Sequence, residues 1–128
     1  MKRRHVEPEA AVESPIAALC RALLTMEQVE EMQSLLVDLC TPAELEALAD
    51  RWRVVPYILA AVPYREIHDR TAVSVTTVGR VARCLSDGAG GYHLAVKRLR
   101  RRGAWVEPGA EPPAPETKPR RSSRTARP

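Results

Sequence analysis

The chain has 128 residues and a net charge of +4, and its 45% of hydrophobic residues suits one domain with a small core. No apolar run approaches the ~20 residues that cross a membrane, which excludes the membrane-spanning classes. The three cysteines, Cys20, Cys40 and Cys84, are widely spaced and match neither a disulfide framework nor a zinc pattern, so we expect a cytoplasmic protein without a metal site.

The first half of the chain predicts helices with defined starting points. Residues 1–13 are charged and show no periodicity, so we expect a disordered N-terminal end. Ser14 followed by Pro15 is typical of a helix start, with serine as the N-cap and proline in the first turn. Thr25 and Gln28 have the spacing of a capping box, which predicts that a second helix begins behind Thr25.

A third helix is predicted from a stronger capping box, which Thr41 and Glu44 form around Pro42. Its apolar positions step by three and four residues, as on one face of a helix. Pro56 lacks the amide hydrogen that a helix interior needs, so it should kink or end this helix. No stretch alternates between apolar and polar residues as a strand would, and the predicted fold class is therefore all-α.

Residues 63–86 have the pattern of a helix-turn-helix. A short helix is followed by a tight turn at residues 71–73 and by Ser74, the expected N-cap of the second helix. Ala72 departs from the pattern, because the turn often carries glycine and alanine tolerates positive φ poorly. The second helix should pack on Ile67 through Val75 and Val78. Its expected buried side consists of Val75, Val78, Ala82 and Leu85.

The opposite side of this second helix carries small hydroxyl residues and arginines. Small residues let a helix backbone approach the major groove, and arginine reads guanine edges or phosphate oxygens. We expect most of this side to face the groove and Arg65 to contact a flanking phosphate. The predicted DNA contacts are Arg65, Ser74, Thr76, Thr77, Gly79, Arg80 and Arg83.

Charge is divided unevenly along the chain. Residues 15–50 hold one base and seven acids, a net of −6, whereas residues 51–102 hold eleven bases and three acids, a net of +8. The second half would therefore attract a polyanion such as double-stranded DNA. Residues 103–128 hold six of the eleven prolines and several arginines, so we expect a disordered tail there and one helical domain over residues 14–102.

Two segments of the chain resemble the bacterial Trp repressor. Residues 41–55 are similar to the helix that precedes its reading head, and residues 65–80 are similar to its helix-turn-helix. The likeness is closer to the TrpR-like YerC/YecD family of that superfamily, and it covers about residues 16–99. The motifs that carry it are Leu39-Cys40-Thr41, Ala49-Asp50-Arg51-Trp52 and Arg80-Val81-Ala82-Arg83-Cys84-Leu85-Ser86 followed by Gly88.

This resemblance implies an intertwined, all-helical homodimer, in which the N-terminal helices form a shared core and two reading heads enter successive major grooves. A dimer would also bury apolar surface that one small chain cannot cover. The implied function is sequence-specific, DNA-binding regulation of transcription, by repression and without enzymatic activity. The alternative is a helical protein–protein or RNA-binding accessory module that does not read DNA sequence.

The family's corepressor, tryptophan, lies between two arginines in the Trp repressor. By position, the pocket corresponds to Thr41, Arg51, Thr77, Arg80 and Cys84. The chain departs from the pattern, because Cys84 replaces a serine and both Trp52 and Pro56 change the surrounding helix. These departures weigh against tryptophan binding, so no cofactor is expected. Arg51 would then pair with a neighbouring carboxylate or help to contact DNA, and Arg80 would contact DNA directly.

Overall fold

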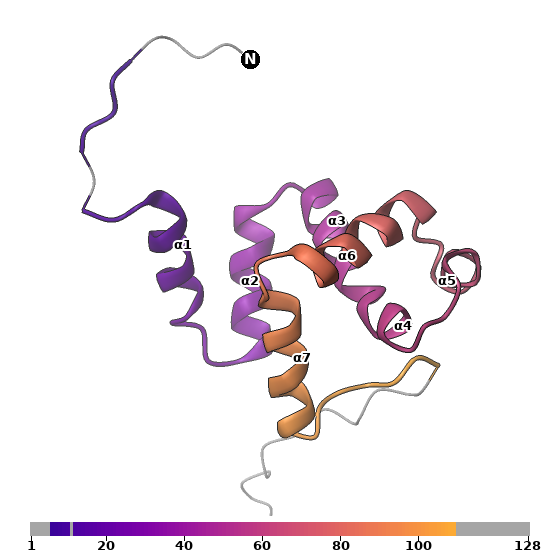
Figure 1. Ribbon diagram of the computed structural model, residues 1–128. Helices are drawn as coiled ribbons and strands as arrows, with labels where there is room; N and C mark the ends of the chain where they lie inside the picture. Colours follow the sequence, from indigo (N-terminus) through magenta and orange to yellow (C-terminus); the bar gives the residue numbers. More distant parts are fainter. Residues whose placement is uncertain (1–5, 11, 110–128) are drawn as a thin grey trace, which may run out of the picture. The chain divides into compact units, whose positions relative to one another are not determined.

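The structure is a computed structural model that describes residues 6–10 and 12–109 (Figure 1). The described residues form helices and no strand, which confirms the all-α class. The helices are α1 (Pro15–Leu23), α2 (Val29–Leu39), α3 (Pro42–Arg53), α4 (Val55–Leu59), α5 (Tyr64–Thr71), α6 (Val75–Asp87) and α7 (Gly91–Arg101). None of the helices in the described ranges has the length and hydropathy needed to cross a membrane. Two compact units divide the chain after Ala47, within α3.

Unit 1 contains α1, α2 and the first turn of α3. The predicted cap of α1 is confirmed, because the Ser14 hydroxyl accepts a hydrogen bond from the Ala17 amide at 3.1 Å. The predicted start of α2 behind Thr25 is wrong. The Thr25 hydroxyl instead donates to the Ala22 carbonyl at 2.7 Å, closing the end of α1. The helix begins three residues later, where the Glu31 carboxylate accepts from the Gln28 amide at 3.3 Å.

The capping box that opens α3 is confirmed in both directions. The Thr41 amide donates to the Glu44 carboxylate at 2.8 Å, and the Glu44 amide donates to the Thr41 hydroxyl at 3.1 Å. The effect of Pro56 is also confirmed, because α3 ends at Arg53 and α4 begins at Val55. Pro56 lies in the first turn of α4, where a missing amide hydrogen costs nothing.

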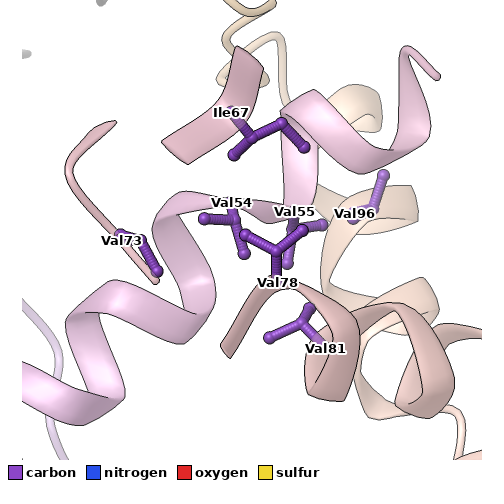
Figure 2. Packing of buried hydrophobic residues seen from close by; sticks show 7 residues of the cluster. All are labelled: Val54, Val55, Ile67, Val73, Val78, Val81 and Val96. Atoms are coloured by element: carbon purple, nitrogen blue, oxygen red, sulfur yellow. The ribbon is translucent and has the colours of Figure 1, made fainter. Parts of the chain in front are cut away.

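The core of unit 2 is a small cluster of aliphatic side chains around α6, which packs on α4, α5 and α7 (Figure 2). Figure 2 shows residues from the start of α4 meeting residues of α6 at the centre of this cluster. Burial of each such side chain stabilises the fold by roughly 1.5–3 kcal/mol relative to exposure. The buried members are Val54, Val55, Ile67, Val73, Val78, Val81 and Val96.

One predicted core residue of the second helix is misplaced. Val78 is fully buried and Ala82 and Leu85 are half-buried, as expected, but Val75 is 44% exposed. Val81 is fully buried instead. Val75 belongs to the first turn of α6, and the valine of the preceding turn, Val73, is buried in the core cluster. The first turn therefore presents an apolar side chain to solvent.

The folded part of the chain also extends beyond the predicted boundary at residue 102. Residues 103–109, here called the C-terminal segment, follow α7 and are described by the structure. The Ala104 amide donates to the Leu99 carbonyl at 2.8 Å, and Trp105 packs against the core cluster. A disordered tail from residue 103 is therefore wrong for this segment, because the indole gives it apolar surface to bury. The rest of the predicted tail, residues 110–128, and residues 1–5 and 11 lie outside the described residues.

Candidate nucleic-acid interface

The turn between α5 and α6 sets the angle at which α6 is presented. Its first residue, Ala72, has φ 65° and ψ 6°, the left-handed conformation that glycine usually supplies. The alanine that departs from the helix-turn-helix pattern therefore adopts the left-handed geometry of the turn, at a cost of roughly 1–2 kcal/mol. The Ala72 amide donates to the His68 carbonyl at 2.8 Å, and this hydrogen bond ends α5 at the start of the turn.

Side chains on both flanks hold this turn in place. The Thr71 hydroxyl is buried, donates to the Ile67 carbonyl at 2.7 Å and accepts from the Val73 amide at 3.1 Å. His68 Nδ1 donates to the Val73 carbonyl at 2.9 Å. Arg53, from the end of α3, donates through Nη1 to the Thr71 carbonyl at 3.1 Å. Sequence reasoning missed Arg53 and His68, since neither bond follows from helical spacing.

The start of α6 is capped as predicted. The Ser74 hydroxyl accepts from the Thr77 amide at 3.1 Å and donates to the Thr77 hydroxyl at 3.0 Å. Both hydroxyls therefore serve the first turn of the helix. The Thr77 amide is thus occupied by the cap, and the positive end of the helix dipole at this terminus favours an anion such as a phosphate.

The solvent side of α6 carries three of the predicted contacts on successive turns. Thr76, Arg80 and Arg83 are exposed and step by four and three residues along the helix. Gly79 lies between them and is half-buried; a Cβ at this position would lie 3.7 Å from the Arg83 side chain, so glycine leaves the backbone open to a partner. Val75, which sequence reasoning placed in the core, lies exposed at the start of the same helix.

The arginines of this side are free to meet an external anion. The ion pairs within residues 6–10 and 12–109 join Arg21 to Glu13 and Arg70 to Glu66. Within those same residues, the predicted contacts Arg65, Arg80 and Arg83 are exposed and take part in no ion pair. Their charges are therefore not neutralised by neighbouring carboxylates in the described part of the chain.

The structure brings together only part of the predicted effector pocket. Arg80 and Cys84 share an open hollow of about 360 Å³ beside α6, lined also by Arg83, Asp87 and Gly88. Thr77 and Arg51 are half-buried in the same unit and do not line this hollow. Thr41 belongs to unit 1, where its hydroxyl caps α3. A second, mostly apolar hollow of about 470 Å³ is lined by Trp52, Cys84, Gly88, Ala89, Gly90, Gly91, Tyr92 and Ala95.

The joint between α6 and α7 depends on a close backbone approach. The Gly88 amide donates to the Cys84 carbonyl at 2.8 Å, and a Cβ on Gly88 would lie only 2.3 Å from that oxygen. Gly90, with φ 91°, then precedes α7. The two glycines therefore suit the end of α6 and the joint that leads into α7. Across the residues that the structure describes, no group of three His, Cys, Asp or Glu side chains is arranged to hold a metal ion.

Comparison with known proteins agrees with this geometry. Residues 14–100 match the model of the family described as Trp repressor protein. The chain is also similar to a curated relative, the uncharacterized protein YerC of Bacillus subtilis (strain 168). The two are 33% identical over 82 residues, which cover 64% of this chain and 79% of the relative. No solved structure matches the chain significantly.

Proposed function

Since the chain belongs to the Trp repressor family, we propose that it is a sequence-specific, DNA-binding regulator of transcription that represses its targets in the cytoplasm as a homodimer. One observation carries the proposal. The left-handed turn at Ala72 and the Ser74 cap present α6 with Val78 and Val81 buried and with Thr76 and Arg80 outward. A capped helix with this division of faces suits the major groove.

The exposed side of α6 offers the chemistry that base edges require. An arginine can donate two hydrogen bonds to guanine, and a threonine hydroxyl or an apolar side chain can contact adenine or the thymine methyl group. Arg80 and Arg83 supply the first kind of contact, and Thr76 with Val75 supplies the second. Arg65 is exposed on the second residue of α5 and is the candidate for a flanking phosphate.

Homodimerisation is supported by the surface of unit 1. Its helices contain no fully buried residue within the described ranges. Large apolar side chains stay exposed along them, including Ile16 at 74% and Leu24 at 83%. A monomer with this surface would be poorly protected from association. A second copy would cover these side chains and bring two α6 helices to one palindromic site.

The expected corepressor pocket gives little support for a bound small molecule. Arg80 and Cys84 meet at one hollow, but the Thr77 hydroxyl is engaged by Ser74. We therefore assign Arg80 to DNA and propose no cofactor. A small-molecule effect on DNA affinity that disappears in Arg80→Ala would reverse this assignment.

The experiment that tests the proposal starts from a random pool of DNA duplexes, because the preferred sequence is not known in advance. Repeated selection on the full chain should enrich a pseudo-palindromic sequence. The selected duplex should then bind at least ~10³-fold more tightly than a scrambled duplex at physiological salt. Failure to enrich any sequence, together with equal binding to a matched RNA duplex, would instead support the accessory RNA-binding module.

A further inference from the structure

The side chains that bind the backbone of the turn between α5 and α6 come from different parts of the chain. The Thr71 hydroxyl and the His68 imidazole, which bind the amide and the carbonyl of Val73, belong to α5 itself. Arg53 is the last residue of α3 and lies 18 positions before its acceptor, the Thr71 carbonyl. Within the part of the chain that the structure describes, Arg53 thus binds this turn from outside the helix-turn-helix.

The two kinds of bond restrict different movements. The bonds from His68 and Thr71 join the turn to α5, so they set the internal geometry of the turn and move with α5. They do not fix the orientation of the helix-turn-helix on the rest of unit 2. The bond from Arg53 joins the turn to the end of α3, and it therefore limits how far α5 and α6 can rotate together.

Arg53 extends from a fixed part of the backbone. The next two residues, Val54 and Val55, are fully buried and lie beside Val78 of α6 in the core cluster (Figure 2). Contacts between aliphatic side chains hold helices together without selecting a direction, whereas a hydrogen bond requires a short distance and a favourable angle. The 3.1 Å bond from Arg53 Nη1 to the Thr71 carbonyl therefore adds a directional restraint to the apolar packing.

The chemistry of this donor suits its acceptor. The last carbonyls of a helix lack amide partners within the helix, and the helix dipole places partial negative charge there. Thr71 ends α5, and across residues 6–10 and 12–109 no ion pair draws the Arg53 guanidinium toward a carboxylate. Arg53 is also exposed, so its replacement should disturb the turn more than the core.

We propose that Arg53 is a positioning residue for DNA reading, which sets the orientation of α6 through the Thr71 carbonyl and touches no base itself. The inference rests on the proposed function. A contact between arginine and guanine requires donors and acceptors in a fixed geometry, whereas contacts with phosphates carry no sequence information. A rotation of α6 would move Arg80 and Arg83 away from their bases. Loss of Arg53 should therefore lower sequence preference more than general affinity.

The test compares the natural chain with Arg53→Gln and Arg53→Lys on the selected duplex and its scrambled form, over a series of salt concentrations. In Arg53→Gln the ratio of the two affinities should fall about tenfold, within the range for one lost base contact. Arg53→Lys keeps the charge and a donor, so its ratio should stay within about threefold of the natural ratio. The slope of log affinity against log salt should hold in both variants, because only a lost phosphate contact would lower it by ~0.9.

A second measurement is made without DNA. The Val73 amide, which donates to the Thr71 hydroxyl, should exchange its hydrogen with solvent about threefold faster in Arg53→Gln, because the turn opens more often. The matched control is Arg101→Gln, which removes the same charge from an exposed arginine of α7. The control should leave both the affinity ratio and the exchange rate unchanged.

Three results would overturn the inference. An unchanged ratio with a lower salt slope in Arg53→Gln would make Arg53 a phosphate contact, and loss of the helical circular-dichroism signal would make it a residue required for folding. Unchanged exchange of the Val73 amide would show that Arg53 does not hold the turn. The natural chain alone decides the proposed function, which fails if that chain prefers no sequence. Sequence preference in the natural chain with an unchanged ratio in Arg53→Gln refutes the inference alone.

Discussion

Arg80 and Arg65 are expected to make different kinds of DNA contact, and their variants should differ accordingly. Arg80 lies on the exposed side of α6, one turn from both Thr76 and Arg83. Arg80→Ala should cost roughly 1–3 kcal/mol on the selected duplex and relax specificity there. Arg65→Ala should weaken binding to every sequence and lower the salt slope by about one. Titration of selected and scrambled duplexes, without added small molecule, measures both effects.

The opposite pattern would exchange the two roles. If Arg65→Ala changed the preferred sequence while Arg80→Ala left affinity and specificity unchanged on both duplexes, Arg80 would not belong to the reading face. An adjacent polar variant, Thr77→Ser, keeps the hydroxyl that the Ser74 cap uses and serves as a control for disturbance of the first turn.

Ala72 is a residue whose strain can be measured. Its left-handed φ of 65° disfavours any side chain, so Ala72→Gly should raise the free energy of unfolding by up to about 1 kcal/mol. The same substitution within α6, Ala82→Gly, should lower it by about 1 kcal/mol, because glycine loses more backbone entropy in a helix. Thermal melting of both variants makes the comparison, and destabilisation by Ala72→Gly would contradict the strained turn.

Helix starts were predictable where the signal is local. Ser14, Thr41 and Ser74 each cap the helix that follows, because a hydroxyl and the amide three residues later suffice for the bond. Thr25 failed because its hydroxyl has a competing acceptor, the Ala22 carbonyl at the end of α1. Which of two nearby caps is used depends on where the preceding helix ends, and the spacing of one motif does not contain that information.

The faces of α6 were predictable in direction but not in extent. Thr76, Arg80 and Arg83 are outward as helical periodicity requires, and Val78 is inward. Exposure of Val75 and burial of Val81 depend on how far the partner helices reach along α6, which is a tertiary property. In the turn before α6, Val73 is buried, whereas Val75 is exposed.

The C-terminal segment makes a testable contribution to unit 2. Trp105 packs on Trp52, so Trp105→Ala should lower the free energy of unfolding by roughly 2 kcal/mol. Its indole Nε1 is buried and finds no acceptor among the described residues. Trp105→Phe keeps an aromatic ring and removes that unpaired donor, so it should be close to neutral. Denaturant unfolding measures the stability of the two variants. Equal stability of Trp105→Ala and the natural chain would contradict the packing of Trp105 on Trp52.

At the scale of the whole molecule, the two units differ in how much they bury. The described residues that are fully buried all belong to unit 2, from Val54 to Val96. Composition predicted that one chain alone has too small a core. The missing buried apolar surface belongs to unit 1. Unit 1 is capped and helical, yet none of its described apolar side chains is fully buried and several are exposed, including Val29 at 76%. Stable helices of this length depend on tertiary packing of an apolar face.

A second copy of the chain is therefore expected to complete unit 1. Sedimentation at micromolar concentration should give a mass near twice 14.2 kDa. Leu39 lies on α2 in line with Met32, Leu35 and Leu36 and is 50% exposed, so Leu39→Glu should place a charge in the interface and shift the mass toward that of one chain. Ser34 is exposed on the opposite side of α2, and Ser34→Glu adds the same charge there without affecting the dimer.

The concentration dependence of unfolding distinguishes this dimer from a stable monomer that only associates weakly. If folding of unit 1 requires the partner, the melting temperature of the natural chain should rise with protein concentration. The Leu39→Glu variant should show a weaker helical circular-dichroism signal and a lower sedimentation mass than the natural chain. The Ser34→Glu variant should match the natural chain in both measurements. A folded monomer with a concentration-independent melting temperature would show that the exposed apolar side chains of α1 and α2 are tolerated in solvent, and two reading heads would then have to be assembled by other means.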